Sequence, residues 1–135
     1  STVPILSIIE ETAKKCKDMD LRKVGILGST KTIKSNLHAN KLRKLDIESI
    51  APDSDSQRFV SECILRIINN QVKDDDKIRM IKIIEKLEKE GARGIILGCT
   101  ELQLLISDQD AKIPMINTTE ILEDSSVNNL INKIK

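Results

Sequence analysis

The sequence predicts an α/β fold, a three-layer sandwich in which about four parallel strands lie between layers of helices. Short apolar runs alternate along the chain with longer segments whose apolar residues recur at helical spacing. Strands that are separated by helices of this length pair in parallel through right-handed crossovers. No repeat, low-complexity segment or flexible linker interrupts the pattern, so we expect residues 1–135 to form a single domain.

The first 52 residues predict two helices and two strands. A helix follows Pro4–Leu6, and its apolar face comprises Ile8, Ile9, Thr12, Ala13, Cys16 and Met19. The apolar run 24–28 predicts a buried strand that ends in a glycine. Residues 29–32 predict a turn, and Thr32 is a candidate N-cap for a helix over Ile33–Leu45. A second strand is expected over Ile47–Ala51, closed by Pro52.

The remaining residues predict three longer helices, a short helix and two strands. Residues 53–56 supply caps for a helix with the apolar pairs Phe59/Val60, Cys63/Ile64 and Ile67/Ile68. After the polar break 69–76, a helix over 77–90 is expected to turn Ile78, Ile81, Ile84 and Leu87 inward and to end at Gly91. Strands over 94–98 and 113–117 flank a short helix over 99–106. A C-terminal helix over 118–135 carries Val127, Leu130, Ile131 and Ile134 on its apolar face.

Composition excludes several classes of partner. The chain has 22 basic and 21 acidic residues, a balance that suggests neither nucleic acid nor an anionic membrane surface. With no Trp, no Tyr and one Phe, it lacks the aromatic side chains on which single-stranded nucleic acids stack. No apolar run approaches the roughly 18 residues that a membrane span needs. Three cysteines without a Cys-x-x-Cys pair predict neither a zinc site nor a disulfide scaffold, and we expect reduced thiols and a cytoplasmic location.

Cys99 is the best candidate for a catalytic group. In open parallel sheets, ligands bind beyond the carboxyl ends of the strands, and Cys99 directly follows a predicted strand and Gly98. At the start of a helix, free N–H groups and the helix dipole would favour a thiolate and lower the thiol pKa, which suits a general acid or base. A free cysteine can equally be a small core residue. We expect that role for Cys16 and Cys63, and both interpretations remain open for Cys99.

Hydroxyl groups at the same predicted edge are candidate ligand contacts. Thr100 could offer a hydroxyl and a backbone N–H to a carboxylate, whereas Glu101 could simply be a first-turn acid that complements the helix dipole. The turn Ser29-Thr30-Lys31-Thr32 concentrates hydroxyls and amides that suit a carboxylate or phosphate, with helix capping as the alternative role of Thr32. Its surroundings match neither a dinucleotide fingerprint nor a P-loop.

His38 is the only histidine in the chain. It falls within a predicted helix, and no second histidine or paired cysteine accompanies it to share a metal ion. We therefore predict no metal site and interpret His38 as structural.

The segment Gly91-Ala92-Arg93-Gly94-Ile95-Ile96-Leu97-Gly98-Cys99-Thr100-Glu101-Leu102 closely resembles the second cysteine motif of the aspartate/glutamate racemase family. Residues 24–28, followed by Ser29-x-x-Thr32, resemble that family's glycine- and threonine-containing turn, with Ser29 where threonine is usual. Pro52, Gln57, Val60 and residues 113–119 fall in the family's order and spacing. The resemblance runs along essentially the whole chain, and the Gly-Cys-Thr-Glu motif is its most specific part.

This resemblance implies a cofactor-independent amino-acid racemase of the acidic amino acids aspartate or glutamate. In that family two cysteines face opposite sides of the substrate's α-carbon, one removing a proton and the other returning one, without pyridoxal phosphate or a metal. Cys99 would be the second of these cysteines. Ser29, Thr32 and Thr100 would help to hold the substrate's carboxylates, and we add Thr30 and Glu101 from the same segments as candidate substrate contacts.

Two departures from the family pattern qualify this expectation. Family members are about twice as long, and the lobe that carries their first cysteine has no counterpart here. We therefore expect the chain to be the second lobe of a two-lobed racemase fold, with the missing first lobe as a partner against which helix 118–135 packs, and we expect a homo-oligomer. The family also commonly has a lysine near the end of the helix that here ends at 67–71, and Lys73 is the nearest candidate. The alternative function is a non-catalytic ligand-binding or assembly module descended from the racemase fold.

Overall fold

A single parallel sheet of four strands organises residues 4–118, the part of the chain that the computed structural model describes. The strands are β1 (Lys23–Leu27), β2 (Glu48–Ile50), β3 (Ile95–Leu97) and β4 (Met115–Asn117), in the order β2-β1-β3-β4. All three neighbouring pairs are parallel. The predicted α/β class with about four parallel strands is confirmed.

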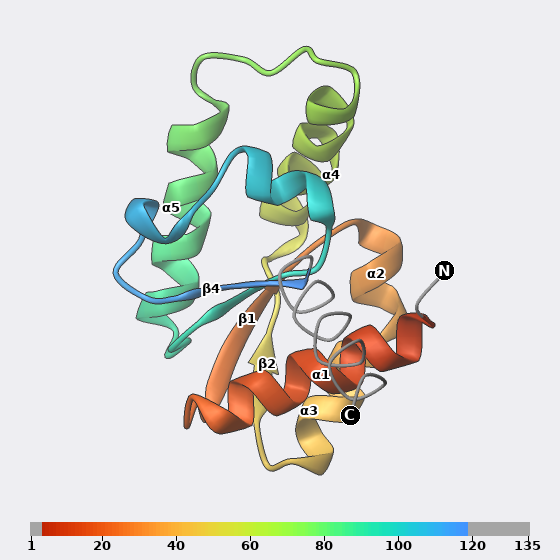
Figure 1. Cartoon of the computed structure of the whole chain (residues 1–135). Helices are drawn as coiled ribbons and strands as arrows, with labels where there is room; N and C mark the ends of the chain where they lie inside the picture. Colours follow the sequence, from red (N-terminus) through yellow and green to blue (C-terminus); the bar gives the residue numbers. More distant parts are fainter. Residues whose placement is uncertain (1–3, 119–135) are drawn as a thin grey trace, which may run out of the picture.

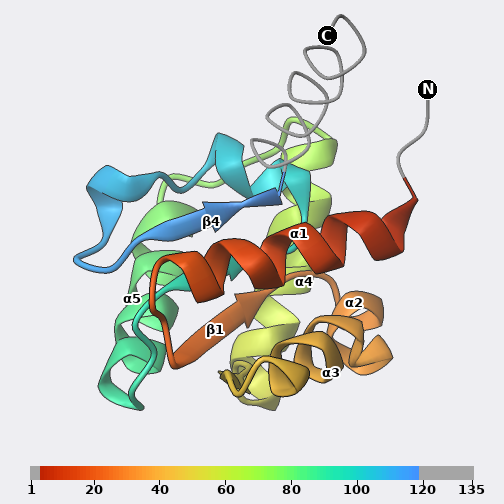
Figure 2. The ribbon, with the colours of Figure 1, turned by 60° about the horizontal axis from the view of Figure 1, so that its bottom comes forward.

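Helices cover both faces of this sheet (Figures 1 and 2). On one face lie α1 (Ile5–Asp18) and α3 (Leu37–Lys44), which share a buried cluster with the strands through Ala13, Cys16 and Leu42. On the other face lie α4 (Ser54–Ile68) and α5 (Asp76–Lys89), whose cluster includes Phe59 and Ile84. The two apolar clusters make the three-layer arrangement, because each face of the sheet needs its own helical cover.

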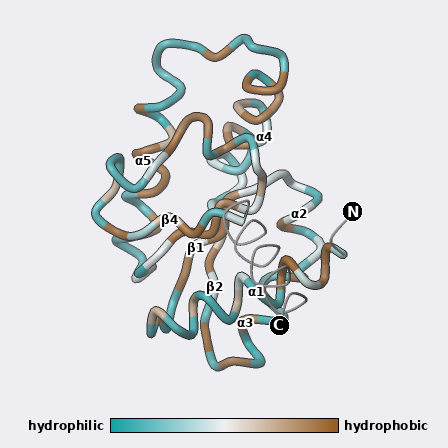
Figure 3. The backbone as a smooth tube through the Cα atoms, in the orientation of Figure 1, coloured by the Kyte–Doolittle hydropathy of each residue, from teal (hydrophilic) through white to brown (hydrophobic). Residues whose placement is uncertain are grey.

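The central strands are apolar because they are buried on both faces. Val24 and Leu27 of β1 have no exposed surface, and neither do Ile95 and Ile96 of β3. Continuous apolar runs of this kind are typical of parallel strands covered by helices on both sides. Figure 3 shows the contrast between the hydrophobic strand segments and the mostly hydrophilic loop that joins α4 to α5. No helix within residues 4–118 is long and apolar enough to cross a membrane.

The prediction of one helix over residues 33–45 was wrong. Two helices occupy this region, α2 (Thr30–Ser35) and α3, and Asn36 separates them with a φ of 58°. Asparagine tolerates this left-handed conformation better than most residues. The N-cap is also not Thr32 but Ser29, whose Oγ accepts a hydrogen bond from the Thr32 backbone N–H at 3.2 Å.

Two further predictions about helices need correction. Ile78 was expected to face the core but is 58% exposed, and Met80 is buried in its place; Ile84 and Leu87 are buried as predicted. The segment after Cys99 is not a regular helix but a short 3₁₀ helix, η1 (Thr100–Leu104), followed by a second one, η2 (Asp108–Asp110). Gly91 does end α5 as expected, at a φ of 110°. The predicted C-terminal helix lies outside the described residues apart from Thr118.

Candidate active site

The carboxyl ends of β1, β3 and β4 meet at one edge of the sheet. The backbone N–H of Gly98 donates to the Leu27 carbonyl at 2.7 Å, which joins the ends of β1 and β3. The Thr118 hydroxyl donates to the Leu97 carbonyl at 3.2 Å, which joins the ends of β3 and β4. The predicted site residues 29–32 and 99–101 follow directly after two of these strands.

Cys99 lies at this edge, partly buried against the cluster beneath α4 and α5. Its Sγ donates a hydrogen bond to Glu101 Oε2 at 2.7 Å. The Thr100 hydroxyl donates to the same carboxylate oxygen at 3.2 Å. The Gly-Cys-Thr-Glu motif therefore forms one local network in which the Glu101 carboxylate accepts from both preceding side chains.

The expected lowering of the Cys99 pKa was wrong. Burial, together with the adjacent Glu101 carboxylate, raises the pKa of the Cys99 thiol to about 11. The hydrogen bond from Cys99 in turn lowers the pKa of Glu101. The helix-dipole argument fails because η1 is only a short 3₁₀ segment and its second residue places a negative charge next to the sulfur. Cys99 therefore rests as a neutral thiol near pH 7.

The other two cysteines are core residues, as predicted. Cys16 on α1 and Cys63 on α4 have no exposed surface. Burial raises the pKa of Cys16 to about 11 and also raises that of Cys63. Both thiols are therefore held neutral and out of reach of a substrate.

The hydroxyl groups of the turn 29–32, which follows β1, serve two purposes: some cap α2 and others contact α4. Ser29 caps α2, and its Oγ lies 3.1 Å from the Thr32 Oγ1. Thr30 turns toward α4, where its hydroxyl lies 2.8 Å from that of Ser61. Thr30 is therefore used to position the turn, whereas Thr32 borders open space at the sheet edge.

Gln57 on α4 is a residue that the sequence-based site assignment missed. Its side-chain amide donates to the Gly28 carbonyl at 2.9 Å and to Ser61 Oγ at 3.2 Å, so it joins α4 to the end of β1. Its Oε1 is buried without a hydrogen-bond donor among the described residues. The four-residue spacing of Gln57 and Ser61 on one helix face was the available signal, but only the fold shows that the face meets Gly28.

A cavity of about 420 Å³ opens beside these segments, on the face that α1 covers. Thr32, Thr100 and Thr118 line it, together with His38 and Gly98. The structure thus brings two of the predicted contacts, Thr32 and Thr100, to one cavity. Four other candidate residues are not among the residues within 4–118 that line this cavity. They are Ser29, Thr30, Cys99 and Glu101.

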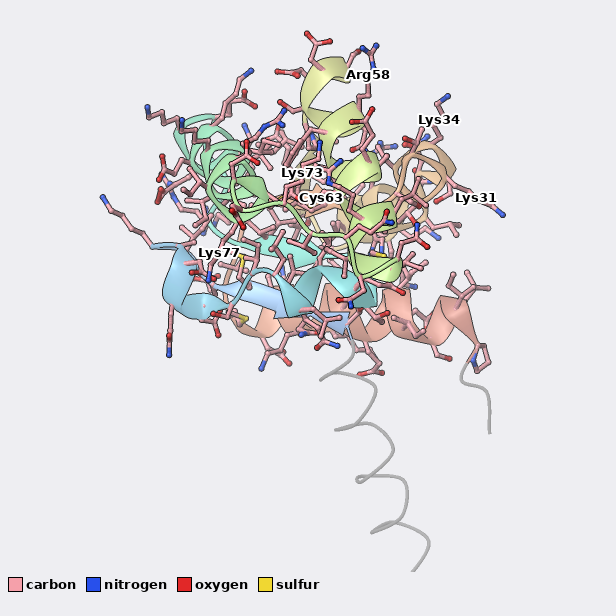
Figure 4. All side chains as sticks on the ribbon, turned by 90° about the horizontal axis from the view of Figure 1, so that it is seen from above. Lys31, Lys34, Arg58, Cys63, Lys73 and Lys77 are labelled. Atoms are coloured by element: carbon pink, nitrogen blue, oxygen red, sulfur yellow. The ribbon has the colours of Figure 1, made fainter. Side chains whose placement is uncertain are left out.

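Of the two remaining candidates, Lys73 lies away from this cavity and His38 borders it. Lys73 stands exposed in the loop between α4 and α5, where its backbone N–H donates to Asp76 at 2.9 Å (Figure 4). His38 lies on α3 and is 7% exposed. Within residues 4–118, no group of three or more His, Cys, Asp or Glu side chains is arranged to hold a metal ion.

Known proteins are similar to this chain in both fold and sequence. A solved structure from Yersinia pestis, described as a candidate Asp/Glu racemase, superimposes with a TM-score of 0.86 at 31% identity, covering 92% of this chain and 55% of that one. An aspartate racemase homologue from Pyrococcus horikoshii OT3 gives a TM-score of 0.75 at 27% identity, over 88% of this chain and 55% of that one.

Curated relatives differ in how much of them this chain represents. It is 29% identical to a glutamate racemase of Sulfurihydrogenibium sp. over 93% of this chain and 46% of that protein. It is 28% identical to an uncharacterised protein of Pectobacterium carotovorum subsp. carotovorum over 91% of this chain and 83% of that protein. The chain thus spans about half the length of the glutamate racemase. The profile of the Asp/Glu/Hydantoin racemase family matches residues 1–124, and the chain belongs to this family.

Proposed function

We propose that this chain supplies one lobe of a cofactor-independent racemase that acts on an acidic amino acid, with Cys99 as one of two acid/base thiols. The observation that carries the proposal is the hydrogen-bonded Cys99–Glu101 pair at the carboxyl end of β3. This edge is where parallel sheets bind ligands. The family and the named relatives support a racemase, and the acidic substrate follows from the resemblance of the Gly-Cys-Thr-Glu motif.

Because its pKa is raised, Cys99 begins as a protonated thiol and acts as the acid in one direction of the reaction. A thiolate on the other lobe would remove the α-proton, and the Cys99 S–H would deliver its proton to the opposite face of the carbanion. Cys99 then becomes the thiolate, next to Glu101. Because that carboxylate disfavours a second negative charge, it makes the Cys99 thiolate a stronger base for the reverse direction.

The substrate's carboxylates would be held by the hydroxyls of Ser29, Thr32 and Thr100, with Thr30 positioning the turn. Removal of an α-proton is difficult because the proton is only weakly acidic, so a desolvated site must stabilise the developing charge. The first lobe of the longer relatives would close over this edge and supply the second thiol. Within this chain neither Cys16 nor Cys63 can do so, because both are fully buried.

Incubation with L-aspartate or L-glutamate in deuterium oxide tests the proposal. We expect no inversion by the isolated chain, because a two-base route needs groups on both faces of the α-carbon. A chimera in which the chain replaces the matching part of the Sulfurihydrogenibium glutamate racemase should racemise and incorporate deuterium. Cys99→Ser should abolish racemisation and leave at most α-proton exchange with retention by the thiolate of the other lobe, whereas the matched core variant Cys63→Ala should retain both activities if it folds.

Inversion by the isolated chain that disappears in Cys99→Ser would contradict the half-site proposal. A chimera that folds and binds substrate yet fails to exchange the α-proton would favour the alternative, a non-catalytic ligand-binding or assembly module. One observation supports that alternative: within residues 4–118 no second partly exposed cysteine accompanies Cys99.

A further inference from the structure

The backbone carbonyl of Gly28 depends on a single side chain for its hydrogen bond. Gly28 lies one residue past the end of β1, and the neighbouring Gly98 N–H is already donated to the Leu27 carbonyl at 2.7 Å. Within residues 4–118, the donor to the Gly28 carbonyl is Nε2 of Gln57 on α4, at 2.9 Å, and no other is present. The position of this carbonyl is therefore controlled from α4 and not by the sheet.

The same amide group also reaches the turn 29–32 by a second route. Gln57 Nε2 donates to Ser61 Oγ at 3.2 Å, and Ser61 Oγ lies 2.8 Å from the hydroxyl of Thr30. An amide nitrogen carries two hydrogens, so both are used. If the amide were turned over, its oxygen would face the Gly28 carbonyl and two acceptors would oppose each other. The amide of Gln57 is thus held in one orientation.

This arrangement has a cost at the other end of the amide. Gln57 Oε1 is buried and has no hydrogen-bond donor among residues 4–118. A buried acceptor without a donor lowers stability, and an apolar side chain of similar length would avoid that cost. An apolar side chain could not hold the Gly28 carbonyl, however. The unpaired oxygen therefore indicates that Gln57 serves through its N–H groups.

The bond to Gly28 also sets the direction of the next backbone N–H. In a trans peptide the carbonyl and the N–H point in opposite directions. Because Gln57 holds the Gly28 carbonyl on the side of α4, the N–H of Ser29 is turned away from α4. The cavity lined by Thr32 and Thr100 opens on the opposite face of the sheet, which α1 covers. A reversed peptide would instead turn a carbonyl oxygen, which repels carboxylates, toward that face.

We propose that Gln57 is a positioning residue for substrate binding. It does not touch the substrate; it holds the Gly28–Ser29 peptide directly and Thr30 through Ser61, so that the turn presents donors to the substrate's carboxylates. The role in substrate binding rests on the proposed racemase function. The orientation of the peptide is a property of the chain itself and is measured without any activity.

Gln57→Glu tests the orientation, because a carboxylate has no hydrogen to donate whereas a protonated carboxyl group has one. Burial beside a carbonyl should raise the pKa of this glutamate above the ordinary value of about 4.3. The nitrogen resonance of Ser29 reports the peptide, since that nitrogen is bonded to the Gly28 carbonyl carbon. In the full chain it should match wild type at about pH 5 and move away as the pH rises to about 8.

Two further variants make this titration specific. Gln71→Glu introduces the same charge at an exposed position after α4 and should leave the Ser29 resonance as in wild type. Gln57→Met has no donor at any pH, so its Ser29 resonance should stay displaced throughout. Wild type has no titrating group at position 57 and supplies the baseline for every other ionisation in the chain.

The racemase chimera tests the effect on binding. At pH 8, Gln57→Glu should raise KM about tenfold or more while kcat falls less than about threefold, because the carboxylates are bound in both the ground and transition states. KM should return toward the wild-type value as the pH falls to about 5.5. A merely structural loss would lower the fraction of active protein, and hence kcat, and would leave KM unchanged.

The proposal is overturned if the Ser29 resonance of Gln57→Glu shows no pH-dependent step, or if Gln71→Glu shows an equal one. An unchanged KM for Gln57→Glu at pH 8, in an active chimera, would overturn it as well. An inactive wild-type chimera contradicts the racemase proposal alone, since the Ser29 resonance still decides whether Gln57 holds the peptide.

Discussion

Cys99 and Glu101 shift each other's pKa in opposite directions, and this mutual effect decides what the sulfur can do. The thiol loses the stabilisation that water gives its thiolate, and the carboxylate opposes a second negative charge. Position at a strand end identified the residue, but its charge state depends first on its burial in the folded chain and then on a side chain two residues further along. At the residue scale, therefore, reactivity follows from immediate neighbours and exposure.

We expect Glu101→Gln to lower the pKa of Cys99 from about 11 toward the ordinary value of 9.0. Burial remains in the variant, so the fall should be partial. A fall of about one unit gives about tenfold more thiolate at pH 8 and a correspondingly faster reaction with iodoacetamide. Alkylation rates measured by mass spectrometry over a pH series check this.

Cys16 and Cys63 serve as internal controls in the same experiment, because both are fully buried. We expect Cys99 to react first in the folded wild-type chain because it alone is partly exposed, and not because its pKa is low. Equal alkylation rates for the three cysteines, or a slower rate for Cys99 in Glu101→Gln, would contradict the argument.

Gly98→Ala should destabilise the chain by about 1–3 kcal/mol. An added Cβ would lie 3.0 Å from the Leu27 carbonyl oxygen, a backbone atom already bonded to the Gly98 N–H. Gly28→Ala is the matched comparison, since its nearest contact is the Thr32 methyl at 3.3 Å, which belongs to a side chain. Urea unfolding should rank Gly98→Ala as the more damaging change, and the reverse order would refute the backbone-contact explanation.

At the scale of elements, a buried ion pair joins α4 to α5. Both Asp76 carboxylate oxygens accept from the Arg66 guanidinium, at 2.9 and 2.7 Å, and Asp76 has no exposed surface. The Lys73 backbone N–H also donates to this carboxylate at 2.9 Å. Arg79 lies 4.1 Å above the Phe59 ring on the same pair of helices. These contacts join α4 to α5 and tie the loop between them to the start of α5.

Asp76→Asn should destabilise the chain by about 3–5 kcal/mol, because it leaves the Arg66 charge without its buried partner. Replacing both residues, as in Arg66→Leu with Asp76→Leu, should restore much of that loss because no unpaired charge remains. Urea unfolding midpoints of the single and double variants measure this. A single variant as stable as wild type would show that the pair contributes little.

The same pair makes stability fall in acid. The Arg66 hydrogen bond lowers the pKa of Asp76 below the ordinary 3.8, so the unfolded state binds protons first as the pH falls. The stabilisation is complete above about pH 5 and is lost as the pH falls through the lowered pKa of folded Asp76. Wild type should therefore lose stability more steeply than the Arg66→Leu/Asp76→Leu variant below pH 4. If the free energy of unfolding falls equally with pH in the two proteins, Asp76 is not the group responsible.

At the scale of the whole molecule, several large apolar side chains stay exposed within residues 4–118. Leu65 and Ile68 share a face at the end of α4, at 58% and 57% exposure, and Val72 follows at 46%. A cluster of this kind is more typical of an interface than of open surface. We therefore expect this face to bind a second copy of the chain, in line with the expected homo-oligomer.

Sedimentation velocity over a range of concentrations tests this association. Leu65→Gln with Ile68→Gln should shift the chain toward the monomer by weakening association at least tenfold. Ile78→Gln, on a separate exposed face of α5 and 58% exposed, is the matched control and should change little. Identical behaviour of the two variants would contradict an interface centred on α4.

Much of the fold could be read from the sequence because apolar periodicity reflects burial directly. The strand 24–28 and the helix that begins at 54 both appear where the pattern predicts them, since each depends on local spacing and capping. The division of helix 33–45 at Asn36 was not predictable in this way, because the pattern is continuous across it. The exposure of Ile78 likewise depends on how α5 rotates against its neighbours.

The sequence by itself determined the α/β class, the strand-end position of Cys99 and the family to which the motif points. Only the tertiary structure decided the charge state of Cys99, the contact of Gln57 with Gly28 and the placement of His38 beside Gly98. The physical reason is distance along the chain. Spacing and capping act within a few residues, whereas desolvation and hydrogen bonds between elements depend on segments that meet only when the sheet is assembled.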